Sequence, residues 1–257
     1  MIKVCHVVFS TNRIDYLKRT FDSHKNLNYD GVQVHKLFID DYPSGRDNDK
    51  LTELVKGYGF DEIVLHEKNL GITSTWEEMF RIVRSRGYDY ILHQEDDVEL
   101  LQPIKVTEMI DALKSNSRYS QIQLKRNAWY SYEDPNKLFS DTDVDFGKYK
   151  IELNESYFWM MFALYPAWIS LIDFKEKTGS CPAEGVVSYH LNKEYKLNTG
   201  ILKNADGTNI VNHFGDLTKG KRCNENEPGW ERFKYADPNK LYNSRTGEEV
   251  NHVSSQI

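Results

Sequence analysis

The sequence predicts an α/β protein with a mostly parallel central sheet that is flanked by helices. Over the first hundred residues, apolar β-branched runs alternate with segments of helical spacing, and a polar segment follows several of the runs. Strands that alternate with helices of ten or more residues need crossover connections, which make the strands parallel and put helices on both faces. Ligands bind such a sheet at the carboxyl ends of its strands.

The predicted strands and helices of the first half follow one another in order. Four apolar runs are predicted strands, at residues 3–9, 32–39, 62–65 and 90–93. Apolar residues recur every three or four positions between these runs, which predicts helices at residues 13–24, 47–58 and 74–86.

The pattern loosens after Pro103. Residues 104–115 are expected to be helical and residues 121–124 extended, whereas residues 127–155 are rich in Tyr, Asp, Ser and Asn and show little periodicity. The apolar segment 157–174 is interpreted as a buried strand that leads into an apolar helix, and a further helix is expected at residues 184–194. We therefore expect an irregular C-terminal half that shapes a second binding site.

Length and composition favour one compact domain. The 257 residues are 39% hydrophobic and 13% aromatic, which provides a core and excludes a disordered chain. We expect a single domain over residues 1–257, with a nucleotide-binding half at 1–101 and an acceptor-binding half with a C-terminal tail at 102–257. The net charge of −6 argues against binding nucleic acid through a broad basic face.

Cysteine use and hydropathy indicate a cytoplasmic protein without a membrane span. Cys5, Cys181 and Cys223 are odd in number and far apart, so neither a disulfide framework nor a zinc site is expected, and a reducing compartment follows. The first apolar run turns polar at Ser10 and no cleavage pattern follows it, so it is interpreted as a strand and not as a signal peptide. Pro166 interrupts the apolar segment 157–174, which argues against a transmembrane helix.

The acidic segment Glu95-Asp96-Asp97 is the sharpest functional signal. It follows the fourth predicted strand, and three adjacent carboxylates repel one another by about 1 kcal/mol unless a cation or hydrogen-bond donors compensate. Mg²⁺ or Mn²⁺ would compensate, because these ions bind a few carboxylates together with phosphate oxygens of a ligand. The alternative interpretation is a solvated acidic turn that caps the next helix.

Two loops at other strand ends are weaker candidates. Asp40 and Asp41 end the second predicted strand, where a carboxylate can accept a hydrogen bond from a nucleotide base or ribose, or cap the following helix. In the loop Asn69-Leu70-Gly71, small residues would let a ligand approach the backbone, while helix capping by Ser74 explains the same segment.

Two single residues in the second half have both a structural and a functional interpretation. A histidine among apolar neighbours, such as His213, is more often a packed residue than a metal ligand. Glu184 precedes a helix, where a negative charge is favourable in any case, and it becomes a candidate base only if a hydroxyl must lose a proton nearby.

Taken together, these segments resemble the GT-A glycosyltransferases, most closely those of the family-2 type. The resemblance covers residues 3–100 well and continues more loosely through residues 158–174 and 182–195 to His213. It rests on a first strand ending in Ser-Thr-Asn-Arg (residues 10–13), a second ending in Asp40-Asp41, the Asn-Leu-Gly loop, and a fourth strand running into the acidic triplet.

The resemblance implies a nucleotide-sugar-dependent hexosyl- or pentosyltransferase that uses Mn²⁺ or Mg²⁺. Carried over to this sequence, the metal ligands are Asp97 and His213, and the catalytic base of an inverting reaction is Glu184. The implied residues for the base, ribose and sugar of the donor are Ser10, Thr11, Arg13, Asp40, Asp41, Asn69, Gly71, Glu95 and Asp96.

Other segments are assigned to substrates from their chemistry. Trp129 lies in a stretch with flat rings and polar groups of the kind that bind sugars, although loop packing explains it equally well. Lys219, Lys221 and Arg222 carry positive charges that suit a diphosphate.

Two departures from the family pattern refine the expectation. The usual Glu-Asp pair at the base position is Glu184-Gly185 here, which leaves the assignment of the base open, and the Gln-x-x-Arg-Trp signature of processive synthases is absent. We expect an enzyme that adds single sugars to a hydroxyl of a glycan or another acceptor, with nucleic acid not excluded.

Two other functions are compatible with the same fold class. A nucleotidyltransferase that makes sugar nucleotides should carry a glycine-rich loop after the first strand, and residues 10–13 contain no glycine. A non-catalytic carbohydrate-binding module would bind sugar without metal, and the intact acidic triplet argues against it.

Overall fold

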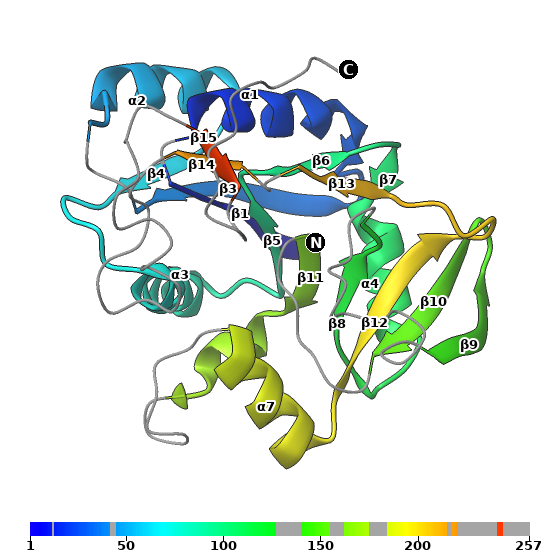
Figure 1. Ribbon diagram of the computed structural model, residues 1–257. Coiled ribbons are helices and arrows are strands. Elements are labelled where there is room, and N and C mark those ends of the chain that lie inside the picture. The colour runs from blue at the N-terminus through cyan, green and yellow to red at the C-terminus, as the bar shows by residue number, and fades with distance from the viewer. Residues whose placement is uncertain are drawn as a thin grey trace. The chain divides into compact units, whose positions relative to one another are not determined.

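Figure 1 shows the computed structural model of the chain. The structure describes residues 1–11, 13–41, 45–126, 140–154, 162–174, 184–214, 217–219 and 241–243. The chain divides into two compact units, residues 1–212 and 213–257. The boundary falls inside strand β13 (Val211–His213), which pairs with β6 (Val98–Leu100), so this strand is described with the first unit. In the second unit, β14 (Leu217–Lys219) pairs antiparallel with β15 (Leu241–Asn243).

The first unit is built on a nine-stranded sheet with the strand order β4-β3-β1-β5-β11-β8-β12-β10-β9. Its first four strands in this order are β4 (Glu62–Leu65), β3 (Val32–Asp40), β1 (Ile2–Ser10) and β5 (Tyr90–Glu95). They are all parallel to one another. The expected parallel sheet in the first half of the chain is therefore confirmed.

The rest of the sheet is mixed. β11 (Phe162–Pro166) runs antiparallel to both β5 and β8 (Tyr119–Leu124), and β12 (Asn198–Asn204) runs parallel to β8. β10 (Tyr149–Asn154) and β9 (Ser140–Phe146) complete the edge as an antiparallel pair. The sequence predicted β8 and β11, the latter leading into the short 3-10 helix η2 (Ala167–Leu171). It did not predict β9, β10 or β12.

Helices cover both faces of the parallel half. On one face, α1 (Ile14–Asp22) and α2 (Asn48–Gly57) pack on Val8 and Phe38. On the other face, α3 (Ile72–Arg86) and α7 (Glu184–Tyr195) pack on Val7 and Leu37 (Figure 1). Neighbouring residues of one strand point to opposite faces, so a strand buried on both sides needs a continuous apolar run. This explains why the first strands lack polar alternation.

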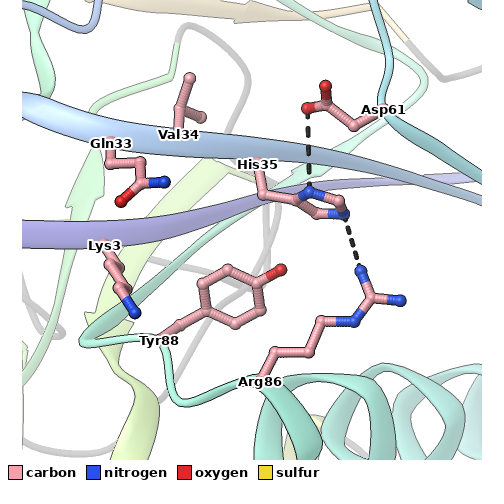
Figure 2. A pocket seen from close by; sticks show the side chains of 7 residues that line it. All are labelled: Lys3, Gln33, Val34, His35, Asp61, Arg86 and Tyr88. Atoms are coloured by element: carbon pink, nitrogen blue, oxygen red, sulfur yellow. Dashed lines mark hydrogen bonds and ion pairs between the residues drawn. The ribbon is translucent and has the colours of Figure 1, made fainter.

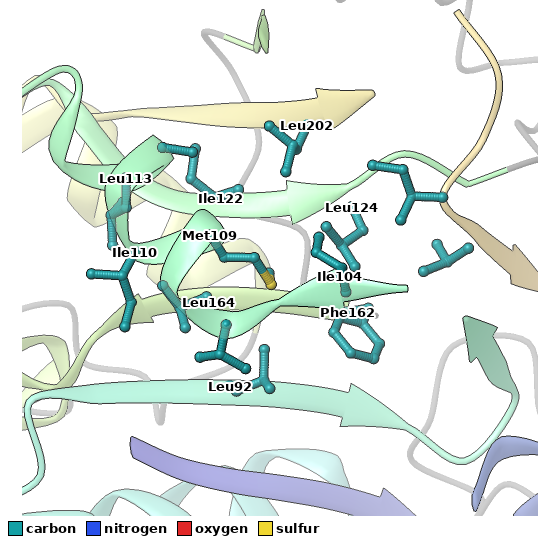
Figure 3. Close-up of a cluster of buried hydrophobic side chains, with 14 of the residues drawn as sticks. Leu92, Ile104, Met109, Ile110, Leu113, Ile122, Leu124, Phe162, Leu164 and Leu202 are labelled. Atoms are coloured by element: carbon teal, nitrogen blue, oxygen red, sulfur yellow. The ribbon is translucent and has the colours of Figure 1, made fainter. Parts of the chain in front are cut away.

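A second hydrophobic core lies under helix α4 (Val106–Lys114). Its residues Met109, Ile110 and Leu113 pack against Ile122 and Leu164 of strands β8 and β11 (Figure 3). This core connects the parallel half to the mixed half, because strand β5 also contributes Leu92 to it.

Three short elements flank this core. The 3-10 helix η1 (Ser23–Asn26) follows α1, and the two-residue strands β2 (Leu27–Asn28) and β7 (Ile104–Lys105) pair in parallel. Among the described residues, no helix is both long enough and apolar enough to cross a membrane.

Candidate functional site

The polar ends of the first strands meet at one edge of the sheet. Ser10 at the end of β1 pairs with Asp40 at the end of β3, and Phe9 of β1 pairs with Glu95 at the end of β5. Parallel strands bring their carboxyl ends to the same edge, so three polar segments far apart in sequence lie side by side. This edge is the candidate site.

Arg13 neutralises much of the acidic triplet. Its guanidinium donates to both carboxylate oxygens of Asp96, with 3.1 Å from Nε to Oδ2, and its Nη2 donates to Oδ2 of Asp97 at 2.8 Å. Both aspartates are buried, with exposed fractions of 2% and 4%. Burial by itself lowers the pKa of Arg13, but the charges of Asp96 and Asp97 raise that pKa well above its usual value. The repulsion expected between adjacent carboxylates is thus offset by a cation of the chain itself.

Asp96 is tied into the surrounding backbone as well. The backbone N–H of Thr11 donates to its Oδ2 at 3.3 Å, and the hydroxyl of Thr20 in α1 donates to its carbonyl oxygen at 2.8 Å. Ser10, the residue before Thr11, is buried and accepts a bond at its carbonyl from the N–H of Asp41 at 3.1 Å. The roles of Ser10, Thr11 and Arg13 toward a nucleotide base stay predictions.

Glu95, Asp97 and His213 form a group that could hold a metal ion. One ligand atom from each residue lies within 4.8 Å of the others. Glu95 ends β5, Asp97 lies in the turn before β6, and His213 ends β13, the partner strand of β6. Two carboxylates and one imidazole suit Mn²⁺ well and Mg²⁺ less well, because imidazole is a softer ligand than oxygen. The sequence singled out Asp97 and His213 for the metal, and the structure brings Glu95 to the same group.

The two aspartates at the end of β3 both have partners within the protein. Asp40 is fully buried, and its Oδ1 accepts a bond from Nη1 of Arg46 at 2.7 Å. Arg46 also donates from Nη2 to the carbonyl of His66 at 2.8 Å, so it ties β3 to the loop after β4. Arg46 and His66 were not singled out from the sequence, because no local pattern relates them to Asp40.

Asp41 organises the loop that contains Asn69 and Gly71. Its carboxylate accepts bonds from the N–H groups of Leu70 and Gly71 at 2.8 and 2.7 Å, and lies 2.6 Å from Nδ1 of His66. The side-chain oxygen of Asn69 also accepts from the N–H of Gly71 at 3.0 Å. Gly71 has a φ of 80°, a conformation that favours glycine. This loop therefore has a structural explanation, and its contact with a donor stays a prediction.

The described part of the structure does not place three groups of predicted residues in the site. Glu184 is the first residue of α7, and the structure describes its backbone but not its side chain. Trp129, Lys221 and Arg222 lie outside the described residues, and Lys219 is described only as part of β14.

A separate cavity of about 380 Å³ lies at the other end of the parallel strands, where their amino ends meet (Figure 2). It is lined by residues at the amino ends of β1 and β3 and by residues that precede β4 and β5, namely Lys3, Gln33, Val34, His35, Asp61, Arg86 and Tyr88. Nε2 of His35 lies 3.2 Å from Glu62 and 3.0 Å from Nη1 of Arg86. Lys3 and Arg86 contribute positive charge to its lining and Asp61 contributes negative charge. The cavity is remote from the acidic turn, which lies at the carboxyl ends of the parallel strands.

Comparison with known proteins identifies the fold. No family model and no curated protein matches the sequence. Among solved structures, GalNAc-T7 with UDP, GalNAc and Mn²⁺ matches at 11% identity and a TM-score of 0.57, over 83% of this chain and 44% of that one. S. aureus TarS 1–349 with UDP matches at 11% identity and a TM-score of 0.51, over 82% and 60%.

A third solved structure supports the same conclusion. The mannosyltransferase PcManGT from Pyrobaculum calidifontis with GDP-Man and Mn²⁺ matches at 11% identity and a TM-score of 0.50, over 76% of this chain and 53% of that one. The chain thus spans about half the length of the proteins it matches. Its fold is the GT-A-like fold of glycosyltransferases, as the sequence predicted.

Proposed function

We propose that this chain is a metal-dependent glycosyltransferase that moves one sugar from a nucleoside-diphosphate sugar to an acceptor hydroxyl. The observation that carries the proposal is the group of Glu95, Asp97 and His213, whose ligand atoms lie within 4.8 Å of one another at the carboxyl edge of a GT-A-like sheet. The three solved structures named above were determined with UDP or GDP-Man, and two of them with Mn²⁺. These ligands are consistent with the proposal.

The proposed metal ligands are Glu95, Asp97 and His213. A bound Mn²⁺ or Mg²⁺ would stabilise the negative charge that develops on the nucleoside diphosphate as it leaves the sugar. Arg13 bonds to both Asp96 and Asp97 and so holds the turn that carries Asp97 in place.

The remaining residues are assigned to the donor and the acceptor. Asp40, Asp41, Ser10 and Thr11 line the strand ends where the nucleotide is proposed to bind, and the loop of Asn69 and Gly71 adjoins them through Asp41. Glu184 at the start of α7 is the proposed base that takes the proton from the acceptor hydroxyl in an inverting reaction. Trp129 is proposed to contact the acceptor, which is a glycan or another hydroxyl-bearing molecule.

Thermal unfolding against a panel of nucleoside diphosphates and nucleotide sugars, with and without Mn²⁺, tests the proposal. A ligand at a hundred times its dissociation constant adds about 2.7 kcal/mol to the free energy of unfolding. We expect stabilisation by nucleotides of one base, and we expect it to depend on Mn²⁺ in the wild type but not in Asp97→Ala. No shift with any nucleotide would overturn the donor assignment, and an Asp97→Ala variant with the wild-type metal response would overturn the metal site.

Turnover of the donor that stabilises the protein then tests the catalytic base. Glu184→Gln should lower the rate of transfer at saturating donor while the donor's thermal shift stays unchanged. A wild-type rate in this variant would remove Glu184 from the mechanism.

A further inference from the structure

A buried chain of hydrogen bonds ends at the acidic turn. Oε1 of Gln94 lies 3.1 Å from Nε2 of His6 and 2.9 Å from Nε2 of His24, and Nδ1 of His6 lies 2.7 Å from the hydroxyl of Tyr29. On its other side, Nε2 of Gln94 donates to the carbonyl oxygen of Val98 at 2.9 Å. Gln94 and His6 are both fully buried.

The donor and acceptor atoms of the Gln94 side-chain amide determine the direction of each of these hydrogen bonds. The Val98 carbonyl only accepts, so the amide nitrogen of Gln94 must face it and Oε1 must face the two histidines. Since Oε1 only accepts, both His6 and His24 carry their proton on Nε2. Nδ1 of His6 is then an acceptor, which the Tyr29 hydroxyl satisfies.

The position of Gln94 in the sequence connects this series of hydrogen bonds to the proposed metal ligands. Gln94 is the residue before Glu95, and Val98 is the residue after Asp97. The side-chain bond from Gln94 to Val98 therefore closes the turn that presents both carboxylates, while the two histidines anchor Gln94 to β1 and η1.

We propose that Gln94 is a positioning residue of the metal site, because its amide joins the buried His6 and the half-buried His24 to the turn that carries Glu95 and Asp97. This inference rests on the proposed function, since it assumes that the turn binds a divalent cation. A neutral amide suits the role, because it holds the turn without adding charge beside the carboxylates. Residues behind metal ligands typically change metal affinity 10- to 100-fold when they are replaced.

Gln94→Met tests the inference, because methionine fills similar space and makes none of the three side-chain hydrogen bonds of Gln94. The matched control is Gln121→Met. Gln121 is equally buried in the same sheet and donates to the Thr199 hydroxyl at 3.1 Å, but it lies on β8, two strands away from β5. Both variants should lose stability without metal, because each removes hydrogen bonds between buried polar groups.

The dissociation constant for Mn²⁺, measured by electron paramagnetic resonance of the free ion, separates the two variants. We expect a rise of about 10-fold or more for Gln94→Met and a wild-type value for Gln121→Met. An Mn²⁺ affinity in folded Gln94→Met within twofold of wild type would overturn the positioning role, as would an equal loss in both variants. Wild-type protein that binds no Mn²⁺ would instead overturn the proposed metal site itself.

His24→Phe provides a second variant if Gln94→Met fails to fold. Phenylalanine can keep the ring contacts of His24 with Phe21 and Phe60, whose centroids lie 5.4 and 6.3 Å away, but it cannot donate to Gln94. We expect a smaller loss of Mn²⁺ affinity, of about threefold or more. An unchanged affinity in this variant would contradict the inference.

Discussion

At the scale of single residues, Arg13 and Arg19 bind acidic partners in the same segment but in different surroundings. The Arg13 side chain is 11% exposed, and the side chains of its partners Asp96 and Asp97, taken without their backbone atoms, are 2% and 6% exposed. The Arg19 side chain is 49% exposed and its partner Glu99 is 19% exposed. Water and salt screen an exposed ion pair, whereas the loss of one partner from a buried pair leaves a charge that nothing offsets.

This difference predicts unequal effects of the same substitution. Arg13→Met should lower the free energy of unfolding by about 3–5 kcal/mol, because two buried carboxylates lose their counter-charge. Arg19→Met is the matched control and should cost about 1 kcal/mol or less. Urea unfolding at pH 7 measures both, and equal losses would contradict a structural role for the Arg13 cluster.

At the scale of elements, a left-handed glycine ends helix α3 and starts the connection to strand β5. The residue after the helix is Gly87, whose φ of 64° and ψ of 52° are left-handed. This turn allows β5 to begin three residues later, at Tyr90, and β5 carries the acidic turn at its far end. A Cβ at Gly87 would have no neighbour within 4 Å, so any cost of a side chain there is conformational.

Gly87→Ala should therefore destabilise the protein by about 1–2 kcal/mol. Gly57→Ala is the control, because Gly57 is the last residue of α2, also has open space around it, and does not have a positive φ. Alanine at Gly57 should leave stability unchanged or raise it by up to about 1 kcal/mol. Thermal unfolding should show a loss of stability for Gly87→Ala alone, and a loss of equal size in both variants would refute the conformational explanation.

At the scale of the whole molecule, the buried His6 and the half-buried His24 couple stability to pH. Burial lowers the pKa of His6 well below its usual value and lowers the pKa of His24 to about 4, and the charge of Lys36 lowers both further. In the unfolded chain a histidine titrates near pH 6.5. Between pH 6.5 and 4 the unfolded chain therefore binds protons that the folded protein does not, and stability falls as the pH falls.

The contribution of His24 can be isolated with the His24→Phe variant. Each pH unit below 6.5 should remove about 1.4 kcal/mol of stability per histidine, so His24 accounts for about 3 kcal/mol by pH 4. Urea unfolding across this range measures the free energy of unfolding of both proteins. As the pH falls, the wild type should lose about that amount more than the variant. Parallel curves would show that His24 is not a buried neutral histidine.

The sequence by itself determined the first half of the fold and the place of the candidate site. In residues 1–100 the apolar runs and helical periods are local signals, and the parallel strands that they predict must bring their polar ends to one edge. The acidic triplet, the two aspartates after the second strand and the Asn-Leu-Gly loop could therefore be placed together from local pattern alone. The same segments carried the resemblance to GT-A enzymes, and the fold is confirmed.

Only the tertiary structure decided the second half of the sheet. β9 has three aspartates among its seven residues, and β12 contains a glycine and two asparagines, which are residue types that are depleted in strands. They form strands because β10 and β8 supply backbone partners. No local pattern reports such pairing.

The partners of the candidate site residues were likewise a matter of tertiary structure. Arg13 is separated from Asp96 by 83 positions, and His6 is separated from Gln94 by 88. A sequence shows which residue types can carry a charge or donate a proton, because that is a property of each side chain. The packing of distant segments decides which of them meet. Here it brings Arg13 into contact with the acidic turn and places Gln94 between two histidines.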